Sequence, residues 1–332
     1  MFDVLERLVN ANGVSGDETA ARKILLECCE GAEVDKMGNV IMRKRREGAK
    51  RVVVCAHMDE VGLIVSNITA EGYLKFKAIG GIDAAILPAK QVTVGARGVR
   101  GVIAVRPKHL VKKSDSAVAK IEEMFIDIGA RDRAEAMGSV QVGDYAAFVG
   151  DYEEMSGGVI KGKAMDDRVG CVIMLELMKH EFPYDMSYMF TVQEEVGCRG
   201  ALALAGMDSV DLVVVLEGTM CADLPNAADD KAVTRMGNGP ALSIMDGVCI
   251  YDRDVNASLR EYAEEKGIKV QWKAAFVGGN DAGKLHTKDG GIPTVAVNVP
   301  CRYIHSPHSV VDKGDIEASF ELLKGWLESG KI

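Results

Sequence analysis

Aromatic residues and long apolar runs are both scarce in this chain of 332 residues. Phe, Trp and Tyr make up 5% of it, and no segment approaches the roughly 20 consecutive apolar residues that span a bilayer. The first ten residues, MFDVLERLVN, lack the basic head, apolar middle and small-residue cleavage site of a signal peptide. We therefore expect neither a membrane protein nor a secreted one.

Positive charge is also in short supply. Lys and Arg number 40 against 49 Asp and Glu, which gives a net charge of −9. Such a balance argues against nucleic acid or an anionic membrane as a partner, because no basic stripe could dominate the negative surface. The longest basic run, Arg43 to Arg46, is interpreted as a solvated strand end.

Cysteine is present without the spacing that would make it structural. The eight cysteines are scattered and form no C-x-x-C pair, which argues against disulfides and against a closed zinc site. We expect them to be reduced, mostly buried and in the cytoplasm. With 48% apolar residues and 27% charged ones, the chain can bury a full core in one large or two moderate domains.

The apolar pattern predicts an α/β sheet domain. A capping box at Ser15–Glu18 indicates a helix that ends near Glu30. The other helices are expected over residues 3–11, 167–180, 198–206, 255–267 and 315–329. Strands are expected over residues 39–45, 51–57, 186–192, 211–217, 270–276 and 294–299.

The block from residue 66 to residue 158 has a different character. Short strands (YLKFKAI, QVTVGAR, GVIAVRP) alternate with glycine-rich turns, and one helical stretch, near SDSAVAKIEEMF, interrupts them. We predict an inserted β-rich domain over 66–158, and one discontinuous α/β domain made of 1–65 and 159–332.

Polar residues collect where the predicted strands end. In open α/β sheets the carboxyl ends of the strands meet at one edge, where functional groups gather. Five segments place candidates there, with the two aspartates opening a helix and the others following strands: His57 and Asp59, Asp166 and Asp167, Glu194 and Glu195, Glu217, and His305.

So many acids and imidazoles in one place require counter-charge, because buried carboxylates are costly unless they are paired or coordinated. A mixed histidine and carboxylate set suits Zn²⁺, Co²⁺ or Mn²⁺. Two such ions about 3.5–4 Å apart are a recurrent apparatus for amide hydrolysis. One of the adjacent glutamates, Glu194 and Glu195, would then bind metal while its neighbour handles a proton.

Each residue also has a simpler interpretation. His57 alone could be a hydrogen-bonded histidine, Asp166 and Asp167 could cap a helix, and Glu217 could belong to a turn. His308 competes with His305, although Pro307 between them would direct it elsewhere. The remaining histidines are interpreted as core or surface residues: His109, His180 and His286.

Several motifs, in order and approximate spacing, resemble one family. They are AHMDEVGLIV, GKAMDDRVG, QEEVGCRGA, LEGT followed by ADLP and GNGP, and RYIHSP. The resemblance is to the tetrahedral aminopeptidase and glutamyl aminopeptidase family of dinuclear zinc or cobalt metallopeptidases, some of whose members carry the label endoglucanase or frv-operon protein. It covers nearly the whole chain, including IEEMFIDIGA in the insertion.

The resemblance implies a fold and an assembly. The fold would be a mixed-sheet, zinc-exopeptidase-like catalytic domain sandwiched by helices, with a small β-barrel-like insertion. In the family the insertion mediates dimer contacts, and dimers build a hollow dodecamer that admits short peptides. The implied reaction is removal of N-terminal residues from such peptides.

The resemblance also implies a role for each site residue. Asp166 would bridge two metal ions, His57 and Glu217 would complete the ligands of one, and Glu195 and His305 those of the other. Glu194 would be the general base, Asp59 would fix His57, and Asp167 would support the site or its helix. Two positions depart from the family pattern: Glu217 stands where Asp is common, and Asn280 in GGNDAG stands where Thr is usual.

Two other functions stay open from the sequence. A glycosidase would use two acids about 5–9.5 Å apart, which adjacent glutamates at a strand end fit poorly. Glycosidases also line their clefts with aromatic residues, whereas this chain has two Trp. The ions could instead only stabilise an assembly or a peptide-binding module, in which case replacing Glu194 would change nothing measurable.

Overall fold

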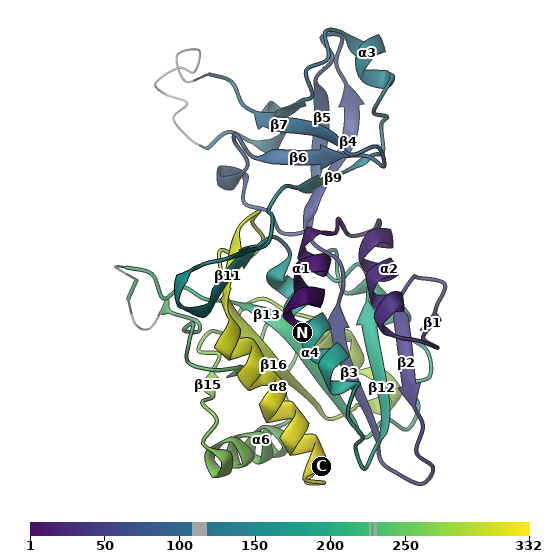
Figure 1. Cartoon of the computed structure of the whole chain (residues 1–332), viewed down its shortest axis with the longest axis vertical. Helices are drawn as coiled ribbons and strands as arrows, with labels where there is room; N and C mark the ends of the chain where they lie inside the picture. Colours follow the sequence, from purple (N-terminus) through teal and green to yellow (C-terminus); the bar gives the residue numbers. More distant parts are fainter. Residues whose placement is uncertain (108–117, 226, 229–230) are drawn as a thin grey trace.

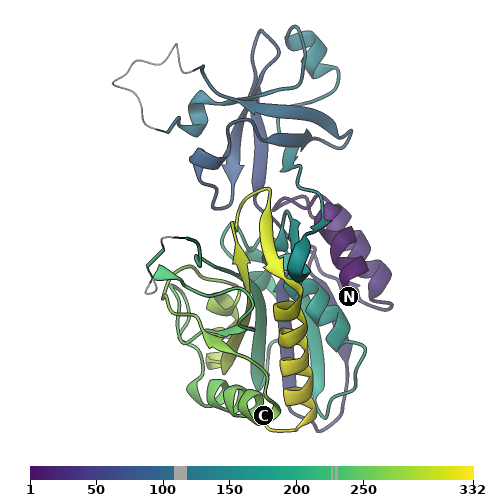
Figure 2. The same ribbon diagram turned by 60° about the vertical axis from the view of Figure 1, so that its left-hand side comes forward.

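The computed structural model describes residues 1–107, 118–225, 227–228 and 231–332, and it divides into an α/β domain and a β-barrel (Figure 1). The barrel stands beyond one end of the main sheet in both views (Figure 2). Within the described ranges, every helix is too short or too polar to cross a membrane.

The α/β domain is built on a mixed sheet of 11 strands. Its main path is β1 (Glu33–Val34), β2 (Val40–Lys44), β12 (Asp185–Thr191), β3 (Arg51–His57), β13 (Leu212–Met220), β16 (Thr294–Arg302), β17 (Ser309–Asp312), β11 (Val159–Gly162) and β10 (Glu153–Glu154). β14 (Ala241–Leu242) pairs with β16 and with β15 (Gln271–Trp272). The four central strands, β12, β3, β13 and β16, are parallel to one another.

Side chains of the central strands are buried on both faces of the sheet. In β3, Val52 and Val54 belong to one hydrophobic core, while Val53 and Cys55 belong to the core on the other face. Because successive residues of a strand point to opposite faces, an unbroken apolar run such as RVVVCA serves both cores.

Seven helices of the described chain cover these two faces. The larger core includes residues of α1 (Phe2–Asn10), α2 (Thr19–Cys28), α4 (Met165–Leu177), α6 (Arg253–Lys266) and α8 (Lys313–Glu328). The smaller core includes residues of α5 (Arg199–Ala203) and α7 (Ala282–Leu285). The sheet is therefore sandwiched by helices, as predicted.

The inserted domain is a closed antiparallel barrel with its own core. Its strands run in the order β4 (Gly62–Ile68), β5 (Leu74–Ile79), β8 (Phe125–Asp127), β7 (Val99–Ala104), β6 (Gln91–Val94) and β9 (Tyr145–Phe148), and α3 (Arg133–Met137) lies between β8 and β9 in the chain. β3 ends at His57 and β4 begins at Gly62, so the barrel stands beyond the carboxyl ends of the parallel strands.

Three local predictions differ from the structure. The capping box is wrong: Glu18 Oε1 accepts from the Gly16 N–H, and the Ser15 hydroxyl donates to Asp59 instead. The strand expected over 270–276 shortens to the two residues of β15. Of the helix expected near 114–125, residues 114–117 lie outside the described ranges, and the rest forms a 3₁₀ turn, η4 (Ile121–Glu123), that leads into β8.

A buried ion pair joins the loop between β3 and β4 to the loop that precedes α4, and both partners also bind the N-terminal segment. Lys163 Nζ lies 2.6 Å from Glu60 Oε1, and the two side chains are 4% and 3% exposed. Lys163 also donates to the Ala11 carbonyl, and Glu60 also accepts from the Gly13 N–H. Burial lowers the pKa of Lys163, and the Glu60 carboxylate opposes that effect.

Replacing Lys163 by Met should therefore destabilise the protein by about 3–5 kcal/mol, because Glu60 would remain buried without its counter-charge. Urea unfolding measures the difference. The matched control is Lys161→Met, which removes a partly exposed pair with Glu153 and should cost less than about 1 kcal/mol. Equal losses of unfolding free energy in the two variants would show that the buried pair stabilises the protein no more than the exposed pair does.

Candidate metal centre

The parallel strands bring the predicted polar residues to one edge of the sheet. The register aligns Thr191 with His57 and Val215 with Cys55, so β12 and β3 end level with each other while β13 continues beyond them to Met220. His57 is the last residue of β3, and Glu217 lies two residues after Val215 in β13. The sheet topology therefore brings these residues together, as expected from the order of the strands.

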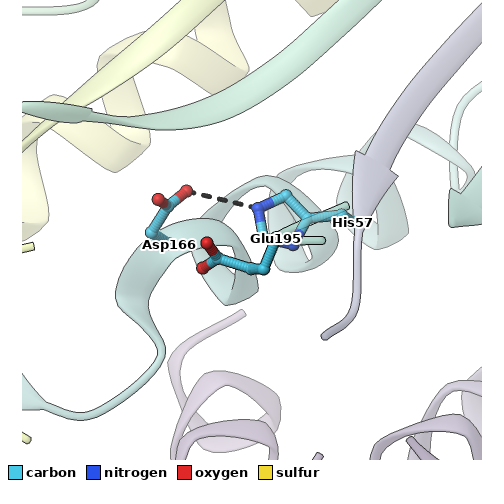
Figure 3. Close-up of side chains that lie close together, drawn as sticks. All are labelled: His57, Asp166 and Glu195. Carbon is cyan, nitrogen blue, oxygen red and sulfur yellow. Dashed lines mark ion pairs between the residues drawn. The ribbon is translucent and has the colours of Figure 1, made fainter. Parts of the chain in front are cut away.

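Asp166 lies between two histidines. Its Oδ1 is 3.4 Å from His57 Nε2, and its Oδ2 is 3.5 Å from His305 Nε2. Each histidine faces one further carboxylate: His57 Nε2 lies 3.3 Å from Glu217 Oε1, and His305 Nε2 lies 3.3 Å from Glu195 Oε2. Figure 3 shows that the side chains of His57, Asp166 and Glu195 lie close together. The five side chains thus form two groups that share Asp166.

These separations fit ligands of a metal ion. Two atoms bound tetrahedrally to Zn²⁺ at about 2.0–2.1 Å lie roughly 3.3–3.5 Å apart. His57 Nε2 and Asp166 Oδ1 are buried and have no hydrogen-bond partner among the described residues. Buried polar atoms without partners are costly, so a cation is the missing neighbour that would satisfy them.

The pKa shifts in this cluster follow from crowding. Burial raises the pKa of Glu195 and of Glu217 well above the ordinary value, and the nearby Asp166 adds to the rise in both. Burial alone would raise the pKa of Asp166 as well, but the facing imidazoles hold it well below its usual range. Cation binding would displace protons from Glu195 and Glu217, so metal affinity should rise with pH.

Asp59 connects the imidazole of His57 to the adjacent glutamates. Its Oδ1 lies 3.4 Å from His57 Nδ1 and accepts a 2.9 Å hydrogen bond from the Glu194 N–H. Its Oδ2 accepts from the Glu195 N–H at 3.2 Å and from the Ser15 hydroxyl at 2.6 Å. Asp59 is completely buried. One carboxylate therefore orients His57 and fixes the backbone that presents both glutamates.

Asp167 and two glycines hold the surrounding backbone. Asp167 accepts from the N–H groups of His57 and Gly170, which joins the end of β3 to the start of α4. A Cβ on Gly218 would lie 2.9 Å from atoms of Asp166, so only glycine lets β13 approach this residue. The Gly81 carbonyl, between β5 and β6, lies 2.9 Å from His305 Nδ1 and orients that ring.

Glu194 lies beside Glu195 in the same part of the site. Its carboxylate makes none of the close contacts with His57 or His305 that the ligand cluster makes. Burial raises its pKa to about 7, and Asp281, Asp59 and Asp166 add to that rise while His57 opposes it. A carboxyl with a pKa near 7 is suited to accept and return a proton at neutral pH.

Some contacts of the site were missed in the sequence. Ser15 donates to Asp59 and does not cap a helix, and the Cys198 side chain donates to Glu194 Oε1 at 3.2 Å. Asp281, in the glycine-rich loop GGNDAG, is buried beside Glu194. Short-range patterns could not find these contacts, because their partners lie in other elements of the chain.

The other histidines take no part in the ligand cluster. His308 is exposed, the His180 ring packs against Phe320 at a tilt of 44° with ring centroids 5.7 Å apart, and His286 Nδ1 lies 2.7 Å from the Ala282 carbonyl. His109 lies outside the described residues.

Comparison with known proteins identifies the family. A family model described as M42 glutamyl aminopeptidase matches residues 38–322. The chain belongs to this family. Its sequence is 29% identical to lysyl aminopeptidase of Pyrococcus furiosus, over 99% of the chain and 97% of the relative.

Solved structures of similar aminopeptidases share the whole fold. The TET aminopeptidase of the archaeon Thaumarchaeota archaeon SCGC AB-539-E09 has a TM-score of 0.94 and 33% identity, with 98% of this chain and 95% of that chain covered. TET1 peptidase of Pyrococcus horikoshii has a TM-score of 0.87 and 31% identity, with 98% of both chains covered.

Membership of the M42 family decides among the three functions considered above. The predicted family, the α/β domain with an inserted barrel, and the aminopeptidase function are confirmed. The enzyme is a peptide hydrolase, and the glycosidase and binding-only alternatives are set aside.

Proposed function

We propose that this M42 family member removes N-terminal residues from short peptides with the help of two divalent cations, Zn²⁺ or Co²⁺, with Mn²⁺ as a further candidate. The observation that carries the proposal is Asp166, whose two oxygens face His57 and His305 separately at 3.4 and 3.5 Å. A carboxylate in that position can join two ions into one centre.

The ligand roles follow from the same contacts. Asp166 would bridge the ions, His57 and Glu217 would hold one of them, and Glu195 and His305 would hold the other. Bound at these positions, the cations would polarise the scissile carbonyl and lower the pKa of an attacking water toward about 7. Asp59 keeps His57 oriented and so sets the direction of its ring nitrogens.

Glu194 moves the proton in this proposal. Its carboxylate takes a proton from the attacking water and delivers it to the nitrogen of the leaving amine, so it ends the cycle unprotonated. The free α-amino group of the peptide would meet one of the cations or a nearby carboxylate, which explains a preference for chain ends.

A peptide panel tests the activity. Protein whose metal content is measured on the same sample should release N-terminal residues from unblocked peptides and leave N-acetylated copies of the same peptides intact. Failure to release any N-terminal residue from a broad panel, with two ions bound per subunit, would refute the proposed function. The same panel measures which N-terminal residue is preferred.

The insertion, predicted over residues 66–158 and containing most of the barrel, is proposed to form subunit contacts and to limit access to the site. Pyrococcus horikoshii TET1 peptidase assembles into a tetrahedron or a large octahedral shell, which supports a homo-oligomer for this chain. We expect the active species to sediment as a dodecamer built from dimers. A fully active monomer would remove the role of assembly in selecting short peptides.

A cytoplasmic location also belongs to the proposal. All eight cysteines are free in the structure, and most of them are buried. Free thiols in this number suit a reducing compartment.

A further inference from the structure

Next to the metal-ligand cluster lies a second group of side chains with cation-binding chemistry. Glu194, Cys198 and Asp281 each offer one ligand atom, and the three atoms lie within 4.8 Å of one another. None of the three belongs to the five ligands assigned above. The group joins a loop after β12 to the residue that caps α7.

The spacing of the sulfur and the carboxylate matches a thiophilic cation. Cys198 Sγ lies 3.2 Å from Glu194 Oε1. Ligands bound to Zn²⁺ at about 2.3 Å (sulfur) and about 2.0 Å (oxygen) lie roughly 3.5 Å apart in tetrahedral geometry. A small movement of either side chain would bring the two atoms to this distance. Cys198 is partly exposed, so an ion can reach it from solvent.

Asp281 supplies an independent sign of a missing cation. Its side chain is 1% exposed. Oδ2 accepts from the Thr191 hydroxyl and faces the Cys55 thiol at 3.6 Å, whereas Oδ1 has no hydrogen-bond partner among the described residues. A buried acceptor without a donor destabilises the folded protein, and a bound cation would remove that cost.

The charges of the group point the same way. Burial raises the pKa of Cys198, and Glu194 and Asp281 raise it further, so the thiol keeps its proton when no cation is bound. Burial likewise raises the pKa of Asp281. A thiol and two carboxyls crowded together in this way are stabilised by one divalent ion.

We propose that Glu194, Cys198 and Asp281 form a third cation site, selective for thiophilic ions such as Zn²⁺, and that its occupation inhibits the enzyme. On binding, a sulfur–metal bond forms and the Cys198 thiol releases its proton to solvent. The Glu194 carboxylate becomes a ligand and can no longer take a proton from water. The inhibitory part rests on the proposed function of Glu194, whereas the binding part does not.

Titration of protein that already holds two zinc ions per subunit tests both parts. Further Zn²⁺ should bind as a third equivalent in equilibrium dialysis and should suppress peptide hydrolysis over the same concentration range. Cd²⁺ serves as the spectroscopic probe, because a cadmium–thiolate bond adds an ultraviolet charge-transfer band.

Cys198→Ser is the decisive variant, because serine keeps the size and the hydrogen-bond donor beside Glu194 but provides no thiolate. We expect the Cd²⁺ band at this site to disappear and both third-ion binding and inhibition to require at least about tenfold more metal. Cys28→Ser, at an exposed cysteine on α2, is the matched control and should leave the third ion and the inhibition unchanged.

The possible outcomes distinguish a failure of the third cation site from a failure of the proposed function. A third ion that binds and inhibits Cys198→Ser as it does the unmodified protein would overturn the site, as would the absence of any Cd²⁺ band that depends on Cys198. If every variant lacks peptide hydrolysis, the proposed function fails, while dialysis and the Cd²⁺ band still decide whether the site exists. Binding of the third ion without loss of hydrolysis would overturn the inhibitory part.

Discussion

Replacing Glu194 by Gln should reduce peptide hydrolysis by about 10²- to 10⁴-fold while two metal ions stay bound. Glutamine has the shape of glutamate but cannot accept the proton of the attacking water, and loss of a general base has effects of this size. The backbone should stay in place, because Asp59 holds the N–H of residue 194 and not its side chain. Steady-state kinetics and metal analysis on the same preparation measure both quantities.

Two controls define this result. Glu195→Gln removes a proposed ligand that lies 3.3 Å from His305, so it should lose metal as well as activity. Glu261→Gln changes an exposed glutamate on α6 and should leave both unchanged. Undiminished hydrolysis in Glu194→Gln would exclude this residue as the general base.

Replacing Asp166 by Asn should remove metal from both halves of the centre and lower activity by about 10²-fold or more. Asparagine offers one carbonyl oxygen and no charge, so it cannot face His57 and His305 with two equivalent oxygens. The cations are expected to contribute several kcal/mol to transition-state stabilisation, and each 1.36 kcal/mol is tenfold in rate. Metal content after dialysis and the hydrolysis rate measure the two effects.

Asp254→Asn is the matched control, because Asp254 is an exposed residue of α6 and is not one of the predicted site residues. Two equivalents of zinc or cobalt per subunit should restore the activity of dialysed native protein but not that of Asp166→Asn. If Asp166→Asn keeps two ions bound with unchanged affinity, Asp166 is not the residue that joins them.

The sequence was most informative where local pattern and global packing agree. RVVVCAH was predicted as a strand buried on both faces, and β3 has the same bounds because its alternate side chains enter two different cores. Prediction was weakest for 270–276, where strand-forming residues extend as a loop beyond Trp272. Pairing partners decide how long such a strand is, and the local pattern does not contain them.

The residue types, their order and their positions at strand ends were enough to predict a histidine and carboxylate cluster, because parallel strands must present their carboxyl ends at one edge. Which atoms face each other depends on contacts between distant segments. Asp166 shares its oxygens between His57 and His305, and Ser15 and Asp281 enter the site through hydrogen bonds to partners 44 and 90 residues away. Only the folded chain fixes such distances, because they result from the register of the sheet and the packing of loops on it.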